Sequence, residues 1–305
     1  MSKDLNTIPN SRIIEKIHVK DHIQIKKGKL PKIISFFRFI FRNFGNIFSN
    51  FLAKKANDIF LTPFDKPPHK DLQNVFKNAV EKDILVHNLK IKTYTWGTSD
   101  KTILLVHGWE SRSCYMVSFV QPLLDQGYKV IAFDGPAHGL SDGKMTNMVD
   151  FGKVTRHIIE NDSSIEGIIA HSFGGPSTIY TLAHMNSSIK KMVIIASPND
   201  ISAVIHRFCT FFHIPEKMEK RMIVHLEKML KHPIQESYMN FNIPKTGLDT
   251  ILLVHDELDD IVPFQDAIDV FEANPNTSLV LTKGLGHSKI KYNPKVIAKI
   301  IHFFE

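Results

Sequence analysis

The sequence predicts an α/β protein in which a mostly parallel sheet is covered by helices on both faces. Short apolar runs rich in Ile, Leu and Val alternate with helix-compatible segments along the chain, a pattern typical of parallel strands joined by crossover helices. Residues 198–247 break this alternation with a Met-, Phe- and His-rich segment of helical periodicity. We therefore expect a core at 71–197 and 248–305, a helical cap inserted at 198–247, and a basic N-terminal extension at 1–70.

The expected strands are short apolar runs bounded by turn or charged residues. In chain order, they lie at 83–87, 89–95, 102–106 and 129–133, from 165, and at 191–196, 250–255 and 278–282. Helices are expected at 115–126, from 264 and at 294–304, and the inserted segment has a helical pattern at 216–231. Because parallel strands point the same way, we expect their carboxyl ends to meet at one edge of the sheet.

The residue composition is that of an ordinary globular protein. Of the 305 residues, 43% are apolar and 23% are charged. The two cysteines, Cys114 and Cys209, are far apart, which favours a reducing compartment over a disulfide framework. The polar N-terminus lacks the apolar core of a signal peptide, and no apolar run reaches the roughly 18 residues that a spanning helix needs. These features predict a cytoplasmic protein.

Positive charge is concentrated at the N-terminus. The net charge is +7, and residues 1–60 hold twelve Lys/Arg and four Asp/Glu, so they contribute +8 and the remainder −1. Apart from this charge, the sequence has no nucleic-acid-binding motif, and we expect no nucleic-acid partner. Residues 1–30 are expected to be extended or loosely ordered, and the Pro-rich residues 61–69 to form a linker.

Residues 32–55 form the strongest amphipathic pattern, with apolar residues on one helical face and Lys, Arg, Asn and Ser on the other. The apolar face consists of Ile33, Phe37, Ile40, Phe41, Phe44, Ile47, Phe48 and Phe51. We expect one amphipathic helix that packs on the body of the protein, near the sheet edge or beside the cap. The alternative is peripheral membrane contact through residues 32–55, with the apolar face in lipid and the cations at headgroups.

A serine follows the strand that begins at Ile165. It lies within Ala170-His171-Ser172-Phe173-Gly174, where small residues stand two positions before and two positions after Ser172. Strand and helix backbones approach closely at such a turn, so small residues are a steric requirement there. The pattern predicts a nucleophile elbow that exposes the Ser172 hydroxyl.

Other polar residues follow the remaining strands, at the edge where ligands bind in open parallel sheets. They are His107-Gly108-Trp109, Asp200, the acidic group Asp256, Asp259 and Asp260, and His287. A serine hydroxyl is a weak nucleophile at neutral pH unless a histidine takes its proton and a carboxylate orients that histidine. The chain order of serine, carboxylate and histidine therefore indicates nucleophilic catalysis.

From about residue 82 to its C-terminus, the chain resembles serine hydrolases of the α/β-hydrolase superfamily, such as esterases and lipases. The motifs that carry the resemblance are His107-Gly108-Trp109, Asp134-Gly135-Pro136-Ala137-His138-Gly139-Leu140-Ser141, Ala170-His171-Ser172-Phe173-Gly174, Asp259-Asp260-Ile261-Val262-Pro263 and Gly286-His287. The resemblance implies Ser172 as nucleophile, His287 as general base and Asp259 as orienting acid. It also implies an oxyanion hole from the backbone N–H groups of Trp109 and Phe173.

Two positions depart from the family pattern. Ala170 stands where the first glycine of the elbow is usual, and Asp256 follows His255 where the family usually has glycine. Several carboxylates therefore crowd one loop. Asp259 is favoured as the acid, with Asp200, Asp256 and Asp260 as alternatives.

Several conspicuous residues are more simply explained by packing. His107 and His138 are expected to shape the turns around the site, and His171 to pack or hydrogen-bond locally rather than to titrate in catalysis. The histidines of the cap lack metal-ligand spacing, and we expect neither a metal nor a cofactor. The Met and Phe residues of the cap are expected to pack within it, with an acyl-binding wall as the alternative.

These features predict a hydrolase acting on a small-molecule carboxylic ester, with an acyl-chain or lipid-like group, through an acyl-enzyme at Ser172. Thioesterase or amidase activity would use the same residues. A non-catalytic binding protein of this fold is a further alternative. Dehalogenases and epoxide hydrolases need a carboxylate at the elbow, so Ser172 argues against both. The oligomeric state does not follow from the sequence.

Overall fold

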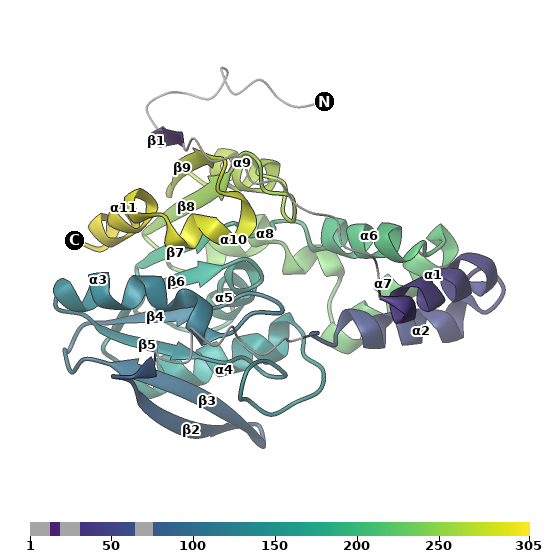
Figure 1. The fold of residues 1–305 in the computed structure, drawn as a ribbon, viewed down its shortest axis with the longest axis horizontal. Coiled ribbons are helices and arrows are strands. Elements are labelled where there is room, and N and C mark those ends of the chain that lie inside the picture. Colours follow the sequence, from purple (N-terminus) through teal and green to yellow (C-terminus); the bar gives the residue numbers. More distant parts are fainter. Residues whose placement is uncertain (1–12, 19–30, 65–75) are drawn as a thin grey trace.

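The computed structural model describes residues 13–18, 31–64 and 76–305. The expectations for most of residues 1–30, and for the linker beyond residue 64, lie outside the described residues. Two layers of helices enclose a central sheet, and a group of helices stands beside it (Figure 1).

Within the described residues, the sheet has nine strands in the order β1-β9-β8-β7-β6-β4-β5-β3-β2. Neighbours from β1 to β5 are parallel, while β3 pairs antiparallel with β5 and β2 pairs antiparallel with β3. The strands are β1 (Ile13–His18), β2 (Val80–Val86), β3 (Leu89–Trp96), β4 (Thr102–Val106), β5 (Lys129–Phe133), β6 (Ile165–His171), β7 (Lys191–Ile195), β8 (Thr250–Asp256) and β9 (Thr277–Lys283). The predicted mostly parallel α/β architecture is confirmed.

Helices bury both faces of this sheet. One apolar cluster joins it to α4 (Met148–Asn161), α5 (Gly174–Ala183) and α9 (Gln265–Ala273). A second cluster on the opposite face joins it to α3 (Val120–Asp125) and α11 (Pro294–Phe304). Every residue of β4 is buried, which explains why the inner strands are continuous apolar runs rather than alternating ones.

Two segments differ locally from the prediction. The expected helix at 115–126 begins as a 3-10 turn at Ser113–Phe119 before α3. Strand β1 was not predicted; it pairs parallel with β9 at the sheet edge, with Ile17 buried and Lys16 exposed. Its pairing partner lies more than 250 residues along the chain, so local sequence could not reveal it. The exposed lysine suits an edge strand, because charge discourages further strand pairing.

The single helix expected at 32–55 is wrong. The structure has two helices, α1 (Lys32–Phe44) and α2 (Ser49–Phe60), joined by a short turn. A Cβ on Gly45 would lie 2.8 Å from Pro215 Cδ and 3.1 Å from Met218 Sδ. Glycine thus permits the end of α1 to approach the start of the inserted helices, and the chain turns there so that α2 can pack against them.

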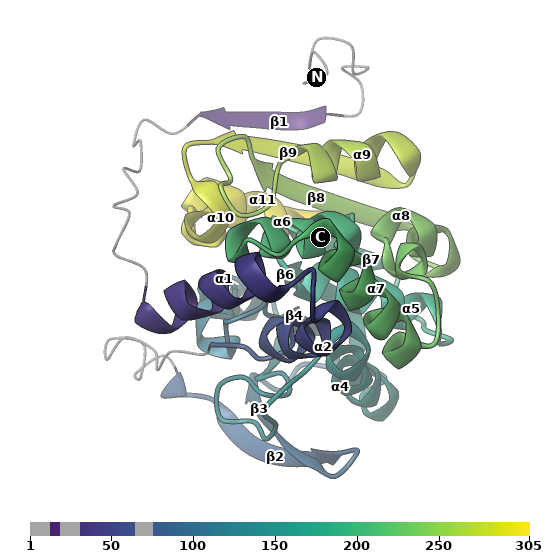
Figure 2. The ribbon, with the colours of Figure 1, turned by 90° about the vertical axis from the view of Figure 1, so that its right-hand side faces the viewer.

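The segment between β7 and β8 is helical, with α6 (Ile201–Phe212), α7 (Glu216–Leu230) and α8 (Met239–Asn242). Helices α1 and α2 pack on α6 and α7, and we call these four helices the helical module (Figure 2). Its own apolar core contains Phe41, Leu52, Ala53, Ile205, Met218 and Met222. The buried Asn57 side chain donates to the carbonyl oxygen of Met222 at 3.0 Å. Among the described helices, none is both long and apolar enough to cross a membrane.

Candidate active site

Ser172 lies at the turn between β6 and α5, in a strained backbone conformation. Its φ of +53° is in the left-handed region, which costs a residue other than glycine about 1–3 kcal/mol. The Ser172 N–H donates to the carbonyl oxygen of Ile195 on β7 at 2.8 Å. A Cβ on Gly174 would lie 2.7 Å from the carbonyl oxygen of His107. The sheet and this close approach hold the turn and leave the hydroxyl at the carboxyl edge.

The structure brings Ser172, His287 and Asp259 together from three separate segments. His287 belongs to α10 (Gly286–Lys289) after β9, and Asp259 lies in the loop after β8. His287 Nε2 lies 3.0 Å from Ser172 Oγ, and His287 Nδ1 lies 2.8 Å from Asp259 Oδ2. With Nδ1–H donating to the carboxylate, Nε2 is free to accept the Ser172 proton. The arrangement can therefore move a proton away from the hydroxyl.

The Asp259 carboxylate is fully buried, and both of its oxygens accept hydrogen bonds. Its Oδ1 accepts the backbone N–H groups of Ile261 and Val262, both at 2.9 Å. His255 Nε2 lies 3.3 Å from Oδ2, beside the His287 contact. Burial alone would raise the pKa of Asp259, but hydrogen bonds with His255 and His287 lower the pKa below its ordinary value. Asp259 is therefore ionised beside His287 at neutral pH.

The alternative acids do not reach His287. Asp256 is buried and accepts the Thr282 hydroxyl at 2.6 Å and the Leu285 N–H at 2.9 Å. Burial raises the pKa of Asp256, and these bonds more than offset it, so the pKa is lowered. Asp200 caps α6, and the Asp260 residue is exposed. Asp256 thus fixes the loop before His287 rather than the imidazole itself.

Trp109 follows β4, and Phe173 directly follows Ser172. Their rings pack edge to face with centroids 5.2 Å apart. Within the part of the chain that the structure describes, neither backbone N–H donates to a protein acceptor. Both N–H groups are therefore free of protein acceptors among the described residues.

His107 and His138 lock the loop that carries Trp109. The His107 Nδ1–H donates to the carbonyl oxygen of Gly108 at 2.7 Å, and its Nε2 accepts the Gly135 N–H at 2.8 Å. Burial lowers the pKa of His107 well below its usual range, so the ring stays neutral. His138 Nε2 accepts the Glu110 N–H at 3.1 Å. Both rings thus hold backbone, as expected for turn-shaping residues.

Two further buried groups lie close in sequence to Ser172 and His287. His171 was expected to pack or hydrogen-bond locally, and Lys291 was not singled out. The Nε2–H of His171 donates to the carbonyl oxygen of His287 at 3.0 Å, and burial lowers the pKa of His171 well below its usual value. Lys291, four residues after His287, is 4% exposed, and burial lowers its pKa to about 8. His171 belongs to the elbow motif, whereas its bond to the loop of His287 depends on the tertiary fold.

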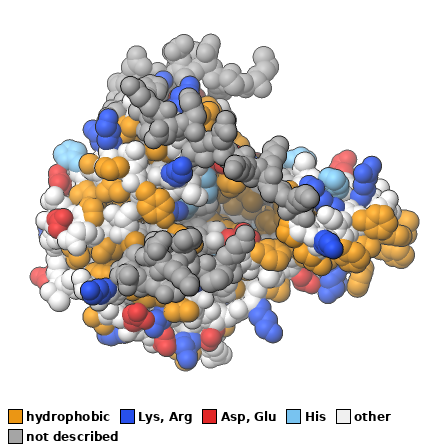
Figure 3. All heavy atoms as spheres, in the orientation of Figure 1, with side chains coloured by type: hydrophobic (Ala, Val, Ile, Leu, Met, Phe, Trp, Pro, Cys, Tyr) orange, Lys and Arg blue, Asp and Glu red, His pale blue; other side chains and the backbone are white. Residues whose placement is uncertain are grey.

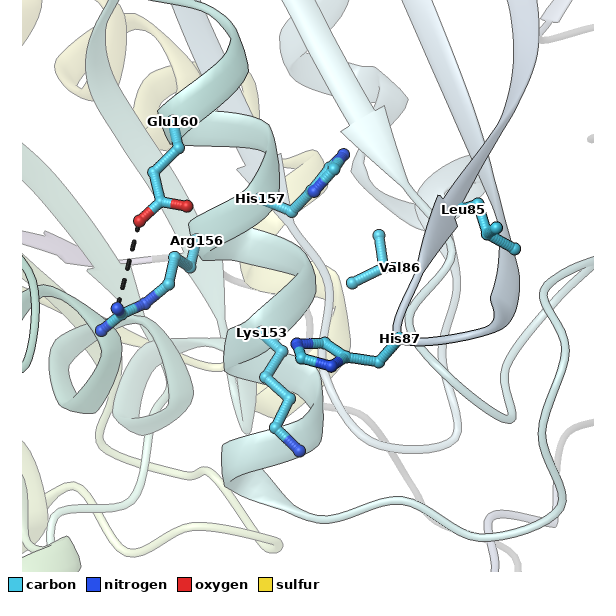
Figure 4. Close-up of a pocket in the computed structure, with 7 residues that line it drawn as sticks. All are labelled: Leu85, Val86, His87, Lys153, Arg156, His157 and Glu160. Atoms are coloured by element: carbon cyan, nitrogen blue, oxygen red, sulfur yellow. Dashed lines mark ion pairs between the residues drawn. The ribbon is translucent and has the colours of Figure 1, made fainter.

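A depression of about 140 Å³ lies away from this site, between the β2–β3 turn and α4 (Figure 4). It is lined by Leu85, Val86, His87, Lys153, Arg156, His157 and Glu160. None of these residues belongs to the Ser172 cluster, and Arg156 is paired with Glu160 at 4.0 Å. Within residues 13–18, 31–64 and 76–305, no group of three or more His, Cys, Asp or Glu is placed to hold a metal ion.

Solved structures with the same architecture include hydrolases. An esterase from Pyrococcus furiosus is 22% identical, with a TM-score of 0.62, over 80% of this chain and 98% of that one. A putative lipase from Acinetobacter baumannii AYE is 16% identical, with a TM-score of 0.60, over 79% and 97% of the two chains. Est1E from Butyrivibrio proteoclasticus, solved with ferulic acid bound, is 18% identical, with a TM-score of 0.59, over 73% and 97%. At these identities the likeness shows the fold alone.

Sequence comparison is decisive for the family. A comparison with curated protein sequences finds no match. The model of the alpha/beta hydrolase family matches residues 103–291, well over half of the chain. This span includes the loop of Trp109, the elbow at Ser172 and both His287 and Asp259. The chain belongs to the α/β-hydrolase family.

Proposed function

We propose that the protein is a serine hydrolase that cleaves carboxylic esters through an acyl-enzyme at Ser172. One observation carries the proposal: the continuous hydrogen-bonded row from Asp259 through His287 to Ser172, with contacts of 2.8 and 3.0 Å. Such a row pairs a nucleophile with a base and the base with an orienting carboxylate. The family of the chain and its esterase and lipase neighbours support the same reaction class.

In the acylation step, Ser172 Oγ attacks the ester carbonyl carbon while His287 Nε2 takes the hydroxyl proton. Asp259 holds the imidazole in the required tautomer and stabilises the imidazolium that forms. The backbone N–H groups of Trp109 and Phe173 donate to the oxyanion of the tetrahedral intermediate. His287 then protonates the departing alkoxide, leaving an ester between the acyl group and Ser172. In the second half-reaction, water gives a proton to His287 and attacks this ester, which releases the acid and restores Ser172.

The surroundings of the cluster favour an apolar acyl group. Leu258 and Ile261 lie close to Asp259 in the chain and remain 50% and 55% exposed. The ring of Phe173, next to Ser172 in the elbow motif, packs against that of Trp109. Because β6 and β7 are parallel neighbours, α6 begins at the same sheet edge as Ser172. We assign α6, α7 and α8 the role of a cap over the substrate, dividing the core into the segments before 198 and after 247.

Active-site labelling tests the nucleophile directly. A serine-reactive fluorophosphonate should label the protein. Ser172→Ala should abolish this labelling and lower kcat for ester hydrolysis by about three orders of magnitude or more. Ser35→Ala, an exposed serine on α1, is the matched control and should retain both. Near-wild-type turnover by folded Ser172→Ala would overturn the proposal. Absence of labelling and turnover in the folded wild type would favour a binding protein instead.

A substrate panel tests the ester class. For p-nitrophenyl esters, we expect kcat/KM to be higher for acyl chains longer than acetyl than for the acetate ester. Longer chains would contact the apolar side chains close to Asp259, such as Leu258 and Ile261. An ester, a thioester and an amide that share one acyl group should then be compared by kcat/KM. This comparison shows which leaving group the enzyme prefers. A preference for the amide or thioester would leave Ser172 in its role and correct the substrate.

A further inference from the structure

The outer surface of α1 and the start of α2 exposes a group of large apolar side chains. We call this group the apolar tip; it consists of Ile33, Phe36, Phe39, Phe44, Ile47, Phe48 and Phe51. Ile47 is 70% exposed and Phe51 63% exposed, values that belong to side chains with almost no protein around them. Figure 3 shows apolar side chains gathered over the end of the molecule that α1 and α2 form. Exposed apolar surface of this kind marks an interaction site.

The apolar tip is not needed to hold the helical module together. A different set of side chains does so: Phe41 is buried against Phe212, with ring centroids 6.2 Å apart, and Leu52 is buried in the same cluster. Helix α1 therefore carries two apolar surfaces, an inner one that the protein covers and an outer one that it leaves exposed. The outer surface needs a partner outside these contacts.

The charge around the apolar tip identifies the kind of partner. Residues 32–60 contain five Lys/Arg and one Asp, a net charge of +4, and α1 has no acidic residue. Among the described residues, Lys32, Arg42 and Lys54 have no ion-pair partner, so these cations are available to an external anion. Arg38 is engaged by α6 at the surface of the module: its Nε–H donates to the carbonyl oxygen of Phe211, and its guanidinium lies 4.7 Å from the centre of the Phe211 ring.

We infer that the apolar tip docks on an anionic lipid surface. Phenylalanine and isoleucine side chains would enter the region between headgroups and acyl chains, while Lys32, Arg42 and Lys54 contact anionic headgroups. A second copy of the chain is a poorer complement, since it would bring another +4 segment against this one. Helices of 13 and 12 residues are suited to lying in the interface and too short to span a bilayer.

The chain that follows α2 is hydrogen-bonded to two loops of the core. The carbonyl oxygen of Leu61, just after α2, accepts the Thr146 N–H at 2.9 Å. The Phe64 N–H donates to Glu110 Oε1 at 3.2 Å, and Glu110 follows Trp109. The end of α2 opposite the apolar tip is thus tied to the loop that follows Trp109. The inference itself stands without the proposed hydrolase activity, since it depends on surface and charge alone.

Vesicle co-sedimentation with the full chain tests the inference without any activity measurement. Vesicles of phosphatidylcholine with about 30% phosphatidylglycerol should pellet the wild type at low salt, with partitioning at least about tenfold above that to pure phosphatidylcholine. The variant Ile47→Ser/Phe48→Ser/Phe51→Ser should lose about tenfold or more of this binding. Leu85→Ser/Leu140→Ser, which alters equally exposed apolar residues elsewhere (69% and 66%), is the matched control and should bind as the wild type does.

A charge variant and two controls complete the experiment. Lys32→Gln/Arg42→Gln/Lys54→Gln should weaken binding to anionic vesicles several-fold, whereas Lys101→Gln/Lys144→Gln, at exposed sites on the body, should not. Circular dichroism checks that every variant is folded. Wild type that stays in the supernatant, or a serine variant that binds as well as wild type, would overturn the inference. So would a dimer in light scattering that this variant dissociates while vesicle binding is absent, since the tip would then be a self-association surface.

Discussion

The Nε2–H of His171 donates to the backbone carbonyl oxygen of His287 at 3.0 Å. His171 directly precedes Ser172, so this bond ties the loop of the proposed base to the elbow of the proposed nucleophile. The rings of the two histidines lie with centroids 5.0 Å apart, and burial keeps His171 neutral. His171 is thus placed to influence the separation of Ser172 Oγ and His287 Nε2 through the backbone of His287.

His171→Phe is expected to keep the ring volume and remove this bond. The loop of His287 would gain freedom, so kcat should fall about tenfold while KM changes little, because the lost contact serves the reacting geometry rather than binding. Steady-state kinetics on a p-nitrophenyl ester check this, with the melting temperature as a control for packing. If kcat stayed at the wild-type value in a folded variant, His171 would serve only the core.

Asp259→Asn is expected to lower kcat by about three to four orders of magnitude with little change in fold. The amide introduced by this change would be a weaker acceptor for the Nδ1–H of His287 than the carboxylate. Its N–H group would favour the tautomer in which Nδ1 carries no proton. Asp200→Asn is the matched control, since asparagine also caps helices well, and should leave kcat within a few-fold. A smaller loss for Asp259→Asn than for Asp200→Asn would reverse the assignment.

Asp256→Asn should act on stability rather than on the chemical step. The buried Asp256 carboxylate accepts from the Thr282 hydroxyl and the Leu285 N–H, and an amide has only one oxygen to serve these donors. We expect the free energy of unfolding, measured by urea denaturation, to fall by about 1–3 kcal/mol. Unchanged stability with lost activity would instead place Asp256 in the catalytic relay.

The sequence could predict strands and candidate residues but not the contacts among them. Strands such as β4 and β5 are continuous buried runs bounded by charged or turn residues, so their positions follow from local pattern. The turn at Gly45 could not be predicted, because its cause is the close approach of Pro215 and Met218. The same holds for the site. The elbow pattern points to Ser172 locally, and the family resemblance favours Asp259, but only the 2.8 Å contact with His287 separates Asp259 from the other candidate acids.

Lys291 should make stability rise with pH in a definite window. Burial lowers the pKa of Lys291 to about 8, below the value of about 10.4 of an exposed lysine. Between these two values the unfolded chain binds more protons than the folded one, so the free energy of unfolding increases with pH there. Between about pH 7.5 and about 10, the free energy of unfolding of the wild type should rise by up to about 3 kcal/mol more than that of Lys291→Met. Parallel urea titrations check this; equal pH slopes in the two proteins would contradict it.

Phe41 and Phe48 provide a matched pair for the two apolar surfaces of the helical module. Phe41 is 1% exposed in the module core, whereas Phe48 is 57% exposed on the apolar tip. Phe41→Ala should cost about 3–5 kcal/mol through lost burial and a cavity, and Phe48→Ala should cost less than about 0.5 kcal/mol, as other surface changes do. Because the module has its own core, the loss should be concentrated there, with faster amide exchange in α1, α2 and α7 than in β4 to β8. Hydrogen exchange by mass spectrometry measures both changes. Equal destabilisation by the two variants would mean that the apolar tip is covered in solution, and unchanged exchange in Phe41→Ala would mean that α1 contributes nothing to the module.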